Sequence, residues 1–275
     1  MAHASVILLW IAYLLYAGAF ALFVVQFLTK SPTLTRVGLV VAAFGLVFQT
    51  LAIVLRGFSA GHVPFVGTYE SLVMVSWSIA LVWHVLESFT RIRAVGLYVL
   101  PVVLVLLTLA WIAYQPPEGL APALRSDIVV LHVIVMLAAI GCFYVAGGAA
   151  IIYLIEEWLL RRRKAGGVLG RLPSLGALEK LVYHATLLGL PFLTAGMLAG
   201  VIRAETFGVP HWWTDSLPLL SVGAWAIYAA LLWGRVRAGW VGSRIAWLAV
   251  SGLIVLLVIR FAAVPYLSGF HTYGG

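Results

Sequence analysis

The side chains of this sequence that could perform chemistry are histidines and tryptophans, and we place most of them on one side of a membrane. Trp212 and Trp213 directly follow His211, and Asp215 stands close behind. A neutral imidazole is the commonest protein ligand for a metal, and two imidazoles form an ordinary axial pair for haem iron. The grouping therefore favours a metal or haem site. The five histidines of this side are His3, His62, His132, His211 and His271.

The composition identifies the setting of these residues. Hydrophobic residues make up 64% of the 275 residues and charged residues only 9%, whereas about a quarter of the residues in soluble proteins are charged. The chain is therefore predicted to cross a membrane several times. Cys142 is the only cysteine, which excludes an intramolecular disulfide and a CxxC redox pair.

The apolar segments predict an all-α, polytopic bundle, because a spanning helix needs about twenty mostly apolar residues. We expect one membrane domain over residues 1–275, with its functional core at about 55–275. The fifth segment is too long for one bilayer and should project into the cytoplasm. The eight predicted spans are 5–28, 35–55, 69–89, 94–114, 128–158, 181–203, 217–233 and 245–266.

The basic residues predict the orientation, because thirteen of the seventeen fall in alternate loops, which the positive-inside rule makes cytoplasmic. Both termini are then external. The net charge of +8 would suggest nucleic acid for a soluble domain, but topology and lipid head groups account for it here, so we expect a bilayer and no nucleic acid. The thirteen are Lys30, Arg36, Arg91, Arg93, Arg161, Arg162, Arg163, Lys164, Arg171, Lys180, Arg235, Arg237 and Arg244; the other four are Arg56, Arg125, Arg203 and Arg260.

Four segments that are distant in the sequence share the predicted outer layer: 61–71, 131–133, the Trp-rich loop at 205–225, and 268–273. A planar cofactor bound at the outer leaflet would require such convergence. The alternatives are an interfacial aromatic belt for Trp212 and Trp213, and an ordinary loop histidine at His62. His84 and His184 lie toward the inner ends of their helices, either as interface residues or as ligands of a second site.

These segments resemble, in the same order, those of the cytochrome c assembly family of haem-handling membrane proteins (the CcsA, ResC and CcmC type). The similarity also includes 188–196, and it implies that His132 and His271 ligate haem beside the loop His211–Trp225. The loop departs from the family pattern at Thr214 and Leu220. Trp233 also stands where the synthetase members have an inner histidine. A HemX- or YpjD-like member linked to haem biosynthesis is therefore the alternative.

The residues of the outer layer offer a physical account of such a site. Trp212, Trp213 and Phe207 can present apolar faces to the flat haem disc. Asp215 and Glu205 are the nearest carboxylates for orienting the ligand imidazoles. The haem propionates need cations, and the predicted external ones are Arg56, Arg125, Arg203 and Arg260. The alternative for each arginine is that it snorkels to lipid phosphates.

The function that we predict is delivery of haem b to apocytochrome c at the outer face of a bacterial inner membrane. The resemblance also implies a ResB/CcsB-like membrane partner. Because the chain supplies no cysteine pair, the reacting thiols must come from the apocytochrome, so we expect a binding protein that can form part of a haem lyase complex rather than an enzyme by itself. A transporter of another substrate is a further alternative, although such proteins usually have polar or broken helices at the midplane.

Overall fold

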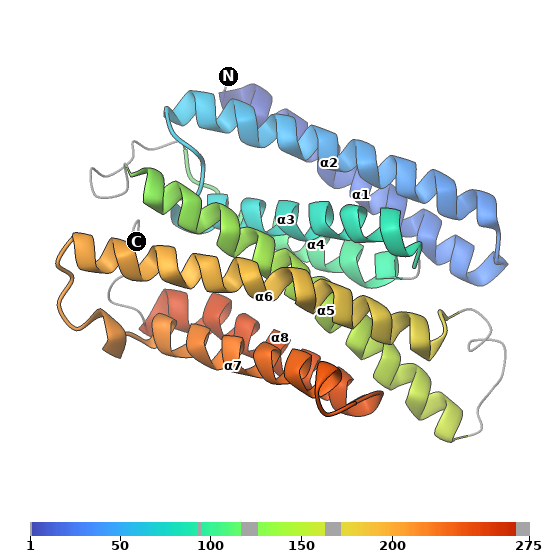
Figure 1. Ribbon diagram of the computed structural model, residues 1–275. Helices are drawn as coiled ribbons and strands as arrows, with labels where there is room; N and C mark the ends of the chain where they lie inside the picture. The colour runs from blue at the N-terminus through green and yellow to red at the C-terminus, as the bar shows by residue number, and fades with distance from the viewer. Residues whose placement is uncertain (1, 93–94, 117–125, 163–171, 268–275) are drawn as a thin grey trace. The chain divides into compact units, whose positions relative to one another are not determined.

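The computed structural model describes residues 2–92, 95–116, 126–162 and 172–267, and in these ranges the regular elements are all helical (Figure 1). The first four helices are α1 (Ala2–Thr29), α2 (Pro32–Ala60), α3 (Gly67–Thr90) and α4 (Gly96–Ile112). The remaining elements are α5 (Asp127–Arg161), α6 (Leu175–Thr206), the short 3-10 helix η4 (Trp212–Thr214), α7 (Ser216–Val236), α8 (Ser243–Val258) and the π-helical segment η5 (Ile259–Leu267).

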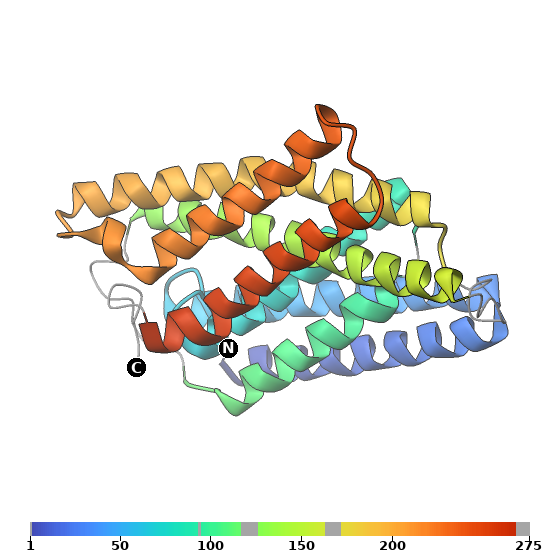
Figure 2. The same cartoon turned by 90° about the horizontal axis from the view of Figure 1, so that it is seen from below.

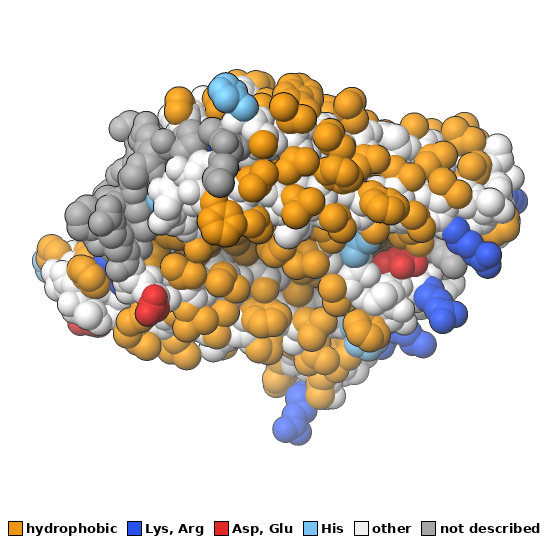
Figure 3. Space-filling view, turned by 90° about the horizontal axis from the view of Figure 1, so that it is seen from above, with side chains coloured by type: hydrophobic (Ala, Val, Ile, Leu, Met, Phe, Trp, Pro, Cys, Tyr) orange, Lys and Arg blue, Asp and Glu red, His pale blue; other side chains and the backbone are white. Residues whose placement is uncertain are grey.

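Seven of these helices are long and apolar enough, by length and composition, to cross a membrane. The remaining predicted span, 94–114, corresponds to α4, a helix of only 17 residues, or about 25 Å at 1.5 Å per residue. Large apolar side chains such as Phe58 (73% exposed) and Phe89 (82%) lie on the helix flanks, which lipid tolerates and water does not. Figure 3 shows this apolar exterior on one face, with the Lys and Arg side chains toward the margin of the view. The predicted all-α, polytopic architecture is confirmed.

The contacts divide the chain into two compact units, Met1–Arg125 (unit 1) and Ser126–Gly275 (unit 2). Unit 1 contains α1 to α4, and unit 2 contains α5 to η5. The single membrane domain predicted over residues 1–275 stays a prediction, and each unit is described by itself below.

Unit 1 is built from two antiparallel helix pairs, α1 with α2 and α3 with α4, as Figure 1 shows. α1 and α2 approach closely because glycines of α2 face aromatic rings of α1: a Cβ on Gly45 would lie 2.9 Å from the Tyr16 ring. A buried polar link then joins this pair to α3. The Tyr16 hydroxyl donates to Gln49 Oε1 (2.8 Å), and Gln49 Nε2 donates to the Val73 carbonyl (3.1 Å) and to Ser76 Oγ (2.9 Å).

Unit 2 is built around α5, which packs against both α6 and α8. Gly147 of α5 lets α8 approach, since a Cβ there would lie 2.6 Å from Leu253. The Phe143 and Tyr228 rings stack at 3.7 Å with an angle of 6° between them, which fastens α7 to α5. α7 and α8 form an antiparallel hairpin, seen clearly in Figure 2. This packing gathers the N-termini of α5 and α7, the C-terminus of α6 and the end of η5 at one end of unit 2, which is its predicted outer end.

α5 has 35 residues, or about 52 Å at 1.5 Å per residue, and it is therefore longer than the bilayer core of about 30 Å. Its last turns carry Glu157 and Arg161, which form an ion pair of 2.8 Å on an exposed surface. The length agrees with the predicted projection of this helix beyond the membrane.

Candidate functional site

His132 lies in the second turn of α5, where its half-buried ring faces α6. Its Nδ1 lies 2.7 Å from the carbonyl oxygen of Gly196. A carbonyl can only accept a hydrogen bond, so Nδ1 must carry the proton in this contact. The neutral ring then keeps its lone pair on Nε2, the atom that a metal would bind. Among the residues that the structure describes, Nε2 itself has no hydrogen-bond partner.

The stretch of α6 that contains Gly196 holds several elements of unit 2 together. The Trp225 indole of α7 donates to Thr194 Oγ1 at 3.0 Å, and this hydroxyl donates to the Leu190 carbonyl at 2.9 Å. About two helical turns from Gly196, Gly189 faces α5, where a Cβ would lie 2.8 Å from the Phe143 ring. The segment 188–196, which is one of those that carry the family resemblance, therefore holds α5, α6 and α7 together.

The loop between α6 and α7 makes hydrogen bonds with the end of α6 and the start of α7. The Trp212 indole donates to Glu205 Oε1 at 2.7 Å. Asp215 is the N-cap of α7, and its Oδ1 accepts from the Leu217 backbone N–H at 2.9 Å. His211 is exposed and adopts a left-handed backbone conformation with φ 54°. Glu205 and Asp215, the carboxylates predicted to orient ligand imidazoles, are thus engaged in shaping this loop.

The aromatic rings of the loop stand at right angles. Trp212 and Trp213 have ring centroids 5.8 Å apart and planes at 82°, and His211 lies 5.5 Å from Trp213 at 77°. Two perpendicular indoles cannot both lie flat against one side of a planar molecule. Trp213 is 54% exposed, whereas Trp212 is tied to Glu205. Trp213 is therefore the ring that can offer its face, and Phe207, at 53% exposed, is a second apolar surface nearby in sequence.

The predicted propionate arginines differ in their surroundings. In unit 2, Arg203 lies over the ring of Phe207, the residue that directly follows α6. Arg260 is half-buried in η5, and its buried Nε has no hydrogen-bond partner among the described residues. Such a buried donor is costly unless an acceptor reaches it. Arg125 lies outside the described residues, as does His271, which follows the end of η5 at Leu267.

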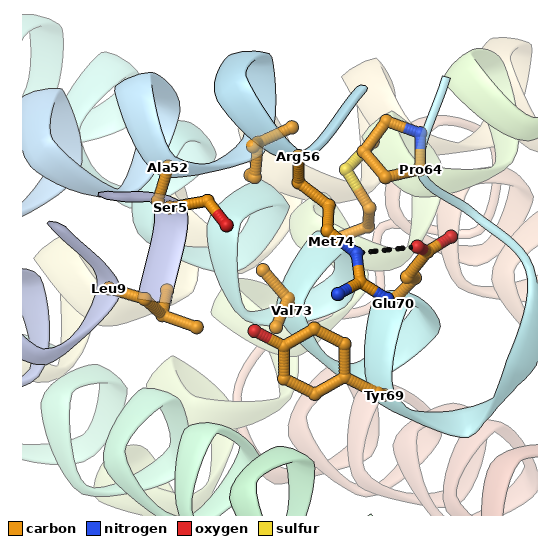
Figure 4. Close-up of a pocket in the computed structure, with 10 residues that line it drawn as sticks. Ser5, Leu9, Ala52, Arg56, Pro64, Tyr69, Glu70, Val73 and Met74 are labelled. Atoms are coloured by element: carbon orange, nitrogen blue, oxygen red, sulfur yellow. Dashed lines mark hydrogen bonds and ion pairs between the residues drawn. The ribbon is translucent and has the colours of Figure 1, made fainter. Parts of the chain in front are cut away.

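Arg56, in unit 1, is buried and already paired, as Figure 4 shows. Its Nε donates to Glu70 Oε1 at 2.8 Å, and its Nη2 donates to the Gln115 carbonyl at 2.8 Å. The guanidinium also lies 4.9 Å from the centroid of the Tyr69 ring. A small cavity lies beside the pair, lined on its other side by Ser5, Leu9 and Ala52. The Nε and Nη2 groups of Arg56 are therefore already engaged within unit 1.

The other described histidines lie elsewhere in the two units. His62 Nδ1 lies 2.8 Å from the Val63 carbonyl in the loop before α3. His84 is half-buried in unit 1 with Nδ1 2.8 Å from the Ala80 carbonyl, four residues earlier in α3. Its buried Nε2 has no hydrogen-bond partner among the described residues. His184 is exposed in unit 2 beside Tyr183. The possible inner site of His84 and His184 would need residues of both units, and no group of three or more metal-ligating residues occurs among the described residues.

Two groups of functional interest were not predicted from the sequence. Nothing in the sequence around Glu70 marked it as the partner of Arg56. The one signal was the spacing of 14 residues, which allows Arg56 at the end of one helix to meet Glu70 at the start of the next. The Gly196 carbonyl contacts His132, and a Cβ on Gly200 would meet the same ring; the spacing of four residues places both glycines on one face of α6. The spacing of the two glycines was the only signal in the sequence, and it does not single out a site because glycines are common in membrane helices.

Comparison with known proteins gives this geometry its context. Residues 65–271 match the family described as Cytochrome C assembly protein. The chain belongs to this family. It is 27% identical to the cytochrome c biogenesis protein CcsA of Gloeobacter violaceus, over 89% of this chain and 88% of the relative. It is 29% identical to CcsA of Chlorella vulgaris, over 82% of each chain. It is also 29% identical to CcsA of Prochlorococcus marinus, over 82% of this chain and 80% of the relative.

Membership confirms the resemblance on which the sequence-based assignment rests, and it makes this a multi-pass membrane protein of cytochrome c biogenesis. The matched range begins before the α3 residue Glu70 and ends at His271, so it includes His132, the loop between α6 and α7, and the end of η5.

Proposed function

We propose that this membrane protein of cytochrome c biogenesis holds haem at the predicted outer end of unit 2 and presents it to an apocytochrome c. The observation that carries the proposal is the state of His132: its Nδ1 is engaged by the Gly196 carbonyl at 2.7 Å, and its Nε2 has no partner among the described residues. Imidazole ligands are characteristically held in this way, with one nitrogen fixed by a carbonyl or carboxylate and the other turned to the metal.

The described residues at the predicted outer end of unit 2 are of the types that bind haem. His132 supplies one axial nitrogen, and the family resemblance assigns the other to His271. Trp213 offers an exposed aromatic face, and the buried Nε of Arg260 is a donor that a propionate oxygen would satisfy. α5 and α8 are antiparallel neighbours, so the chain leaves η5 at the same end of unit 2 at which α5 begins.

In this proposal the protein is a carrier and a holder. Haem b, when bound, supplies the group to be attached, with its iron reduced while the CxxCH thiols of the apocytochrome approach. The residues of the chain orient the haem, shield one of its faces and keep it at the surface. No thiol of the chain takes part, since Cys142 is its only cysteine and is buried in α5. A ResB/CcsB-like partner would complete a haem lyase complex in a bacterial plasma membrane.

A HemX- or YpjD-like role in haem biosynthesis is the second candidate function. Two observations favour it: Thr214 and Leu220 replace tryptophans of the family loop, and Trp212 and Trp213 are perpendicular instead of forming one flat platform. Both functions would use a haem-binding outer end. They differ in whether haem leaves the protein for a cytochrome.

Absorption spectroscopy of the full chain, purified from haem-replete cells in detergent, tests the proposal. We expect a six-coordinate haem spectrum that changes to a five-coordinate form, or loses intensity, in His132→Ala and His271→Ala. Added imidazole should partly restore the His132→Ala spectrum by filling the vacated ligand position. His3→Ala and His84→Ala are the matched controls, which should keep the wild-type spectrum. Wild-type haem content in both His132→Ala and His271→Ala would contradict the assignment.

A complementation assay separates the two candidate functions. In a strain that lacks its own assembly protein, the chain should restore covalent haem in cytochrome c, and His132→Ala should not. Restored haem synthesis without covalent attachment would instead assign the protein to the biosynthetic role.

A further inference from the structure

α6 contacts His132 through the Gly196 carbonyl and through the side of Gly200 where a Cβ would stand. The Gly196 carbonyl lies 2.7 Å from Nδ1 of the imidazole. Gly200, one turn further along α6, faces the same ring: a Cβ built on Gly200 would lie 3.1 Å from His132 Cε1 and 3.3 Å from Nδ1. A methyl group at position 200 would therefore press on the ring, which would have to shift by a few tenths of an ångström. Residues four apart share one face of a helix, so the carbonyl and the gap belong to a single surface facing α5.

We propose that Gly200 and the Gly196 carbonyl are positioning groups, which hold His132 in the Nδ1-protonated tautomer with Nε2 as its ligand atom before haem arrives. The proposal rests on the proposed function for the identity of the ligand, but the held tautomer is a property of the protein alone. A ring that is already oriented loses little conformational freedom on binding. Fixing the tautomer also removes the competing form, in which Nε2 carries the proton and cannot ligate.

The glycine at position 200 is explained by this contact and not by the backbone. Its φ is not in the left-handed region, since the positive-φ glycines of the described residues are Gly61, Gly67, Gly208, Gly239 and Gly242. A glycine inside a helix lowers helix stability relative to alanine. With no backbone requirement, the close approach of the imidazole is the reason the structure offers for a residue without a side chain.

Gly223 of α7 provides the matched control. It is also a helical glycine, but a Cβ there would have no neighbour within 4 Å. Gly200→Ala and Gly223→Ala make the same chemical change and both raise helix propensity. They differ in whether the new methyl group meets the His132 ring.

The first experiment needs no haem. The full chain is labelled with ¹⁵N-histidine, produced in haem-deficient cells and studied by NMR in detergent micelles, with His132→Gln to assign the signals. We expect a single Nδ1-protonated tautomer for His132, which becomes a mixture of tautomers in Gly200→Ala and is unchanged in Gly223→Ala. Wild-type signals of the Nε2-protonated tautomer would overturn the proposal even if Gly200→Ala does not fold. So would a pure Nδ1-protonated tautomer in Gly200→Ala.

The second experiment measures haem binding by titration of the same apo proteins. Removing a group that orients a metal-ligating histidine weakens metal binding by about 10–100-fold. We expect haem binding to be about 10-fold weaker in Gly200→Ala and unchanged in Gly223→Ala. Wild-type affinity of Gly200→Ala, where His132→Ala loses haem, would overturn the positioning role. If His132→Ala itself binds haem normally, the proposed function fails, and with it the ligand role given to Nε2. The tautomer experiment still tests whether Gly200 and the Gly196 carbonyl position the His132 ring.

Discussion

The Arg56 guanidinium and the Glu70 carboxylate form a buried ion pair at the predicted outer end of unit 1, with Nε 2.8 Å from Oε1 and side chains 7% and 5% exposed. The pair joins several elements. Glu70 Oε2 accepts from the Val66 backbone N–H at 3.0 Å in the loop before α3, and Arg56 Nη2 reaches the Gln115 carbonyl beyond α4. It therefore fastens the end of α2, the start of α3 and the chain after α4 to one another.

Glu70→Gln should destabilise the protein, because it leaves the Arg56 charge buried without its counter-ion. Removing one partner of a buried pair typically costs about 3–5 kcal/mol. The thermal midpoint of the purified full chain in detergent, followed by the loss of monodisperse protein, is the measurement. Replacing both residues, as in Arg56→Met with Glu70→Leu, should recover much of the loss because no charge is then left unpaired.

The same variants test the earlier assignment of Arg56 to a haem propionate. If Arg56 fastens the loop, haem content per folded protein should be equal in wild type and in the double variant. If Arg56 instead binds a propionate, the double variant should lose haem, and Glu70→Gln should keep it because the guanidinium is released.

The fold was predictable from the sequence because apolar length and loop charge are strong local signals. All eight predicted segments are helical, and the fifth has the length that its composition indicated. The 17 residues of α4 are fewer than the 21 predicted for 94–114, since the helix starts only at Gly96 and ends at Ile112.

The candidate site was predictable in its residue types but not in its contacts. His132 stood out because a histidine inside an apolar helix is costly unless it has a partner. That the partner is the Gly196 carbonyl depends on the register of α5 against α6, which composition does not encode. The same holds for Asp215, whose sequence position suggested a ligand partner and whose contact with the Leu217 N–H is that of a helix cap.

Asp215→Asn should therefore be tolerated, whereas Asp215→Ala should lower stability by about 0.5–2 kcal/mol, since asparagine caps a helix as well as aspartate does. Thermal midpoints of the two variants, compared at equal expression, provide the measurement. Haem content should stay at the wild-type level in Asp215→Asn. A haem loss in this variant without a loss of stability would show that the negative charge, and not the cap, is what the site requires.

The orientation in the membrane is tested by reporter fusions. An enzyme that is active only outside the cytoplasm, fused after Gly275, should be active, because thirteen of the seventeen basic residues lie in the alternate loops. The same enzyme inserted between residues 161 and 180 should be inactive, and a cytoplasmic reporter should give the opposite pattern at both positions. Identical results at the two positions would mean that the number of spans is wrong by one, and His132 and His211 would no longer be expected to share a side.

The two tryptophans of the outer loop should have separable roles. Trp213→Ala removes the exposed aromatic face, so we expect it to lower haem retention through purification with little change in thermal midpoint. Trp212→Ala breaks the 2.7 Å bond to Glu205, so it should loosen the loop and lower the midpoint, and Glu205→Ala should reproduce its effect.

Restoring the family pattern tests the same loop from the opposite direction. Thr214→Trp and Leu220→Trp add aromatic surface to the loop and to the first turns of α7, and a haem platform should then retain haem more tightly. If the loop is only an interfacial aromatic belt, neither these variants nor Trp213→Ala should change haem retention, and their effects should be confined to stability in the membrane. Haem per protein after identical purification, at matched expression, distinguishes the two outcomes, since an interfacial ring contributes to anchoring the helices but has no contact with the bound ligand.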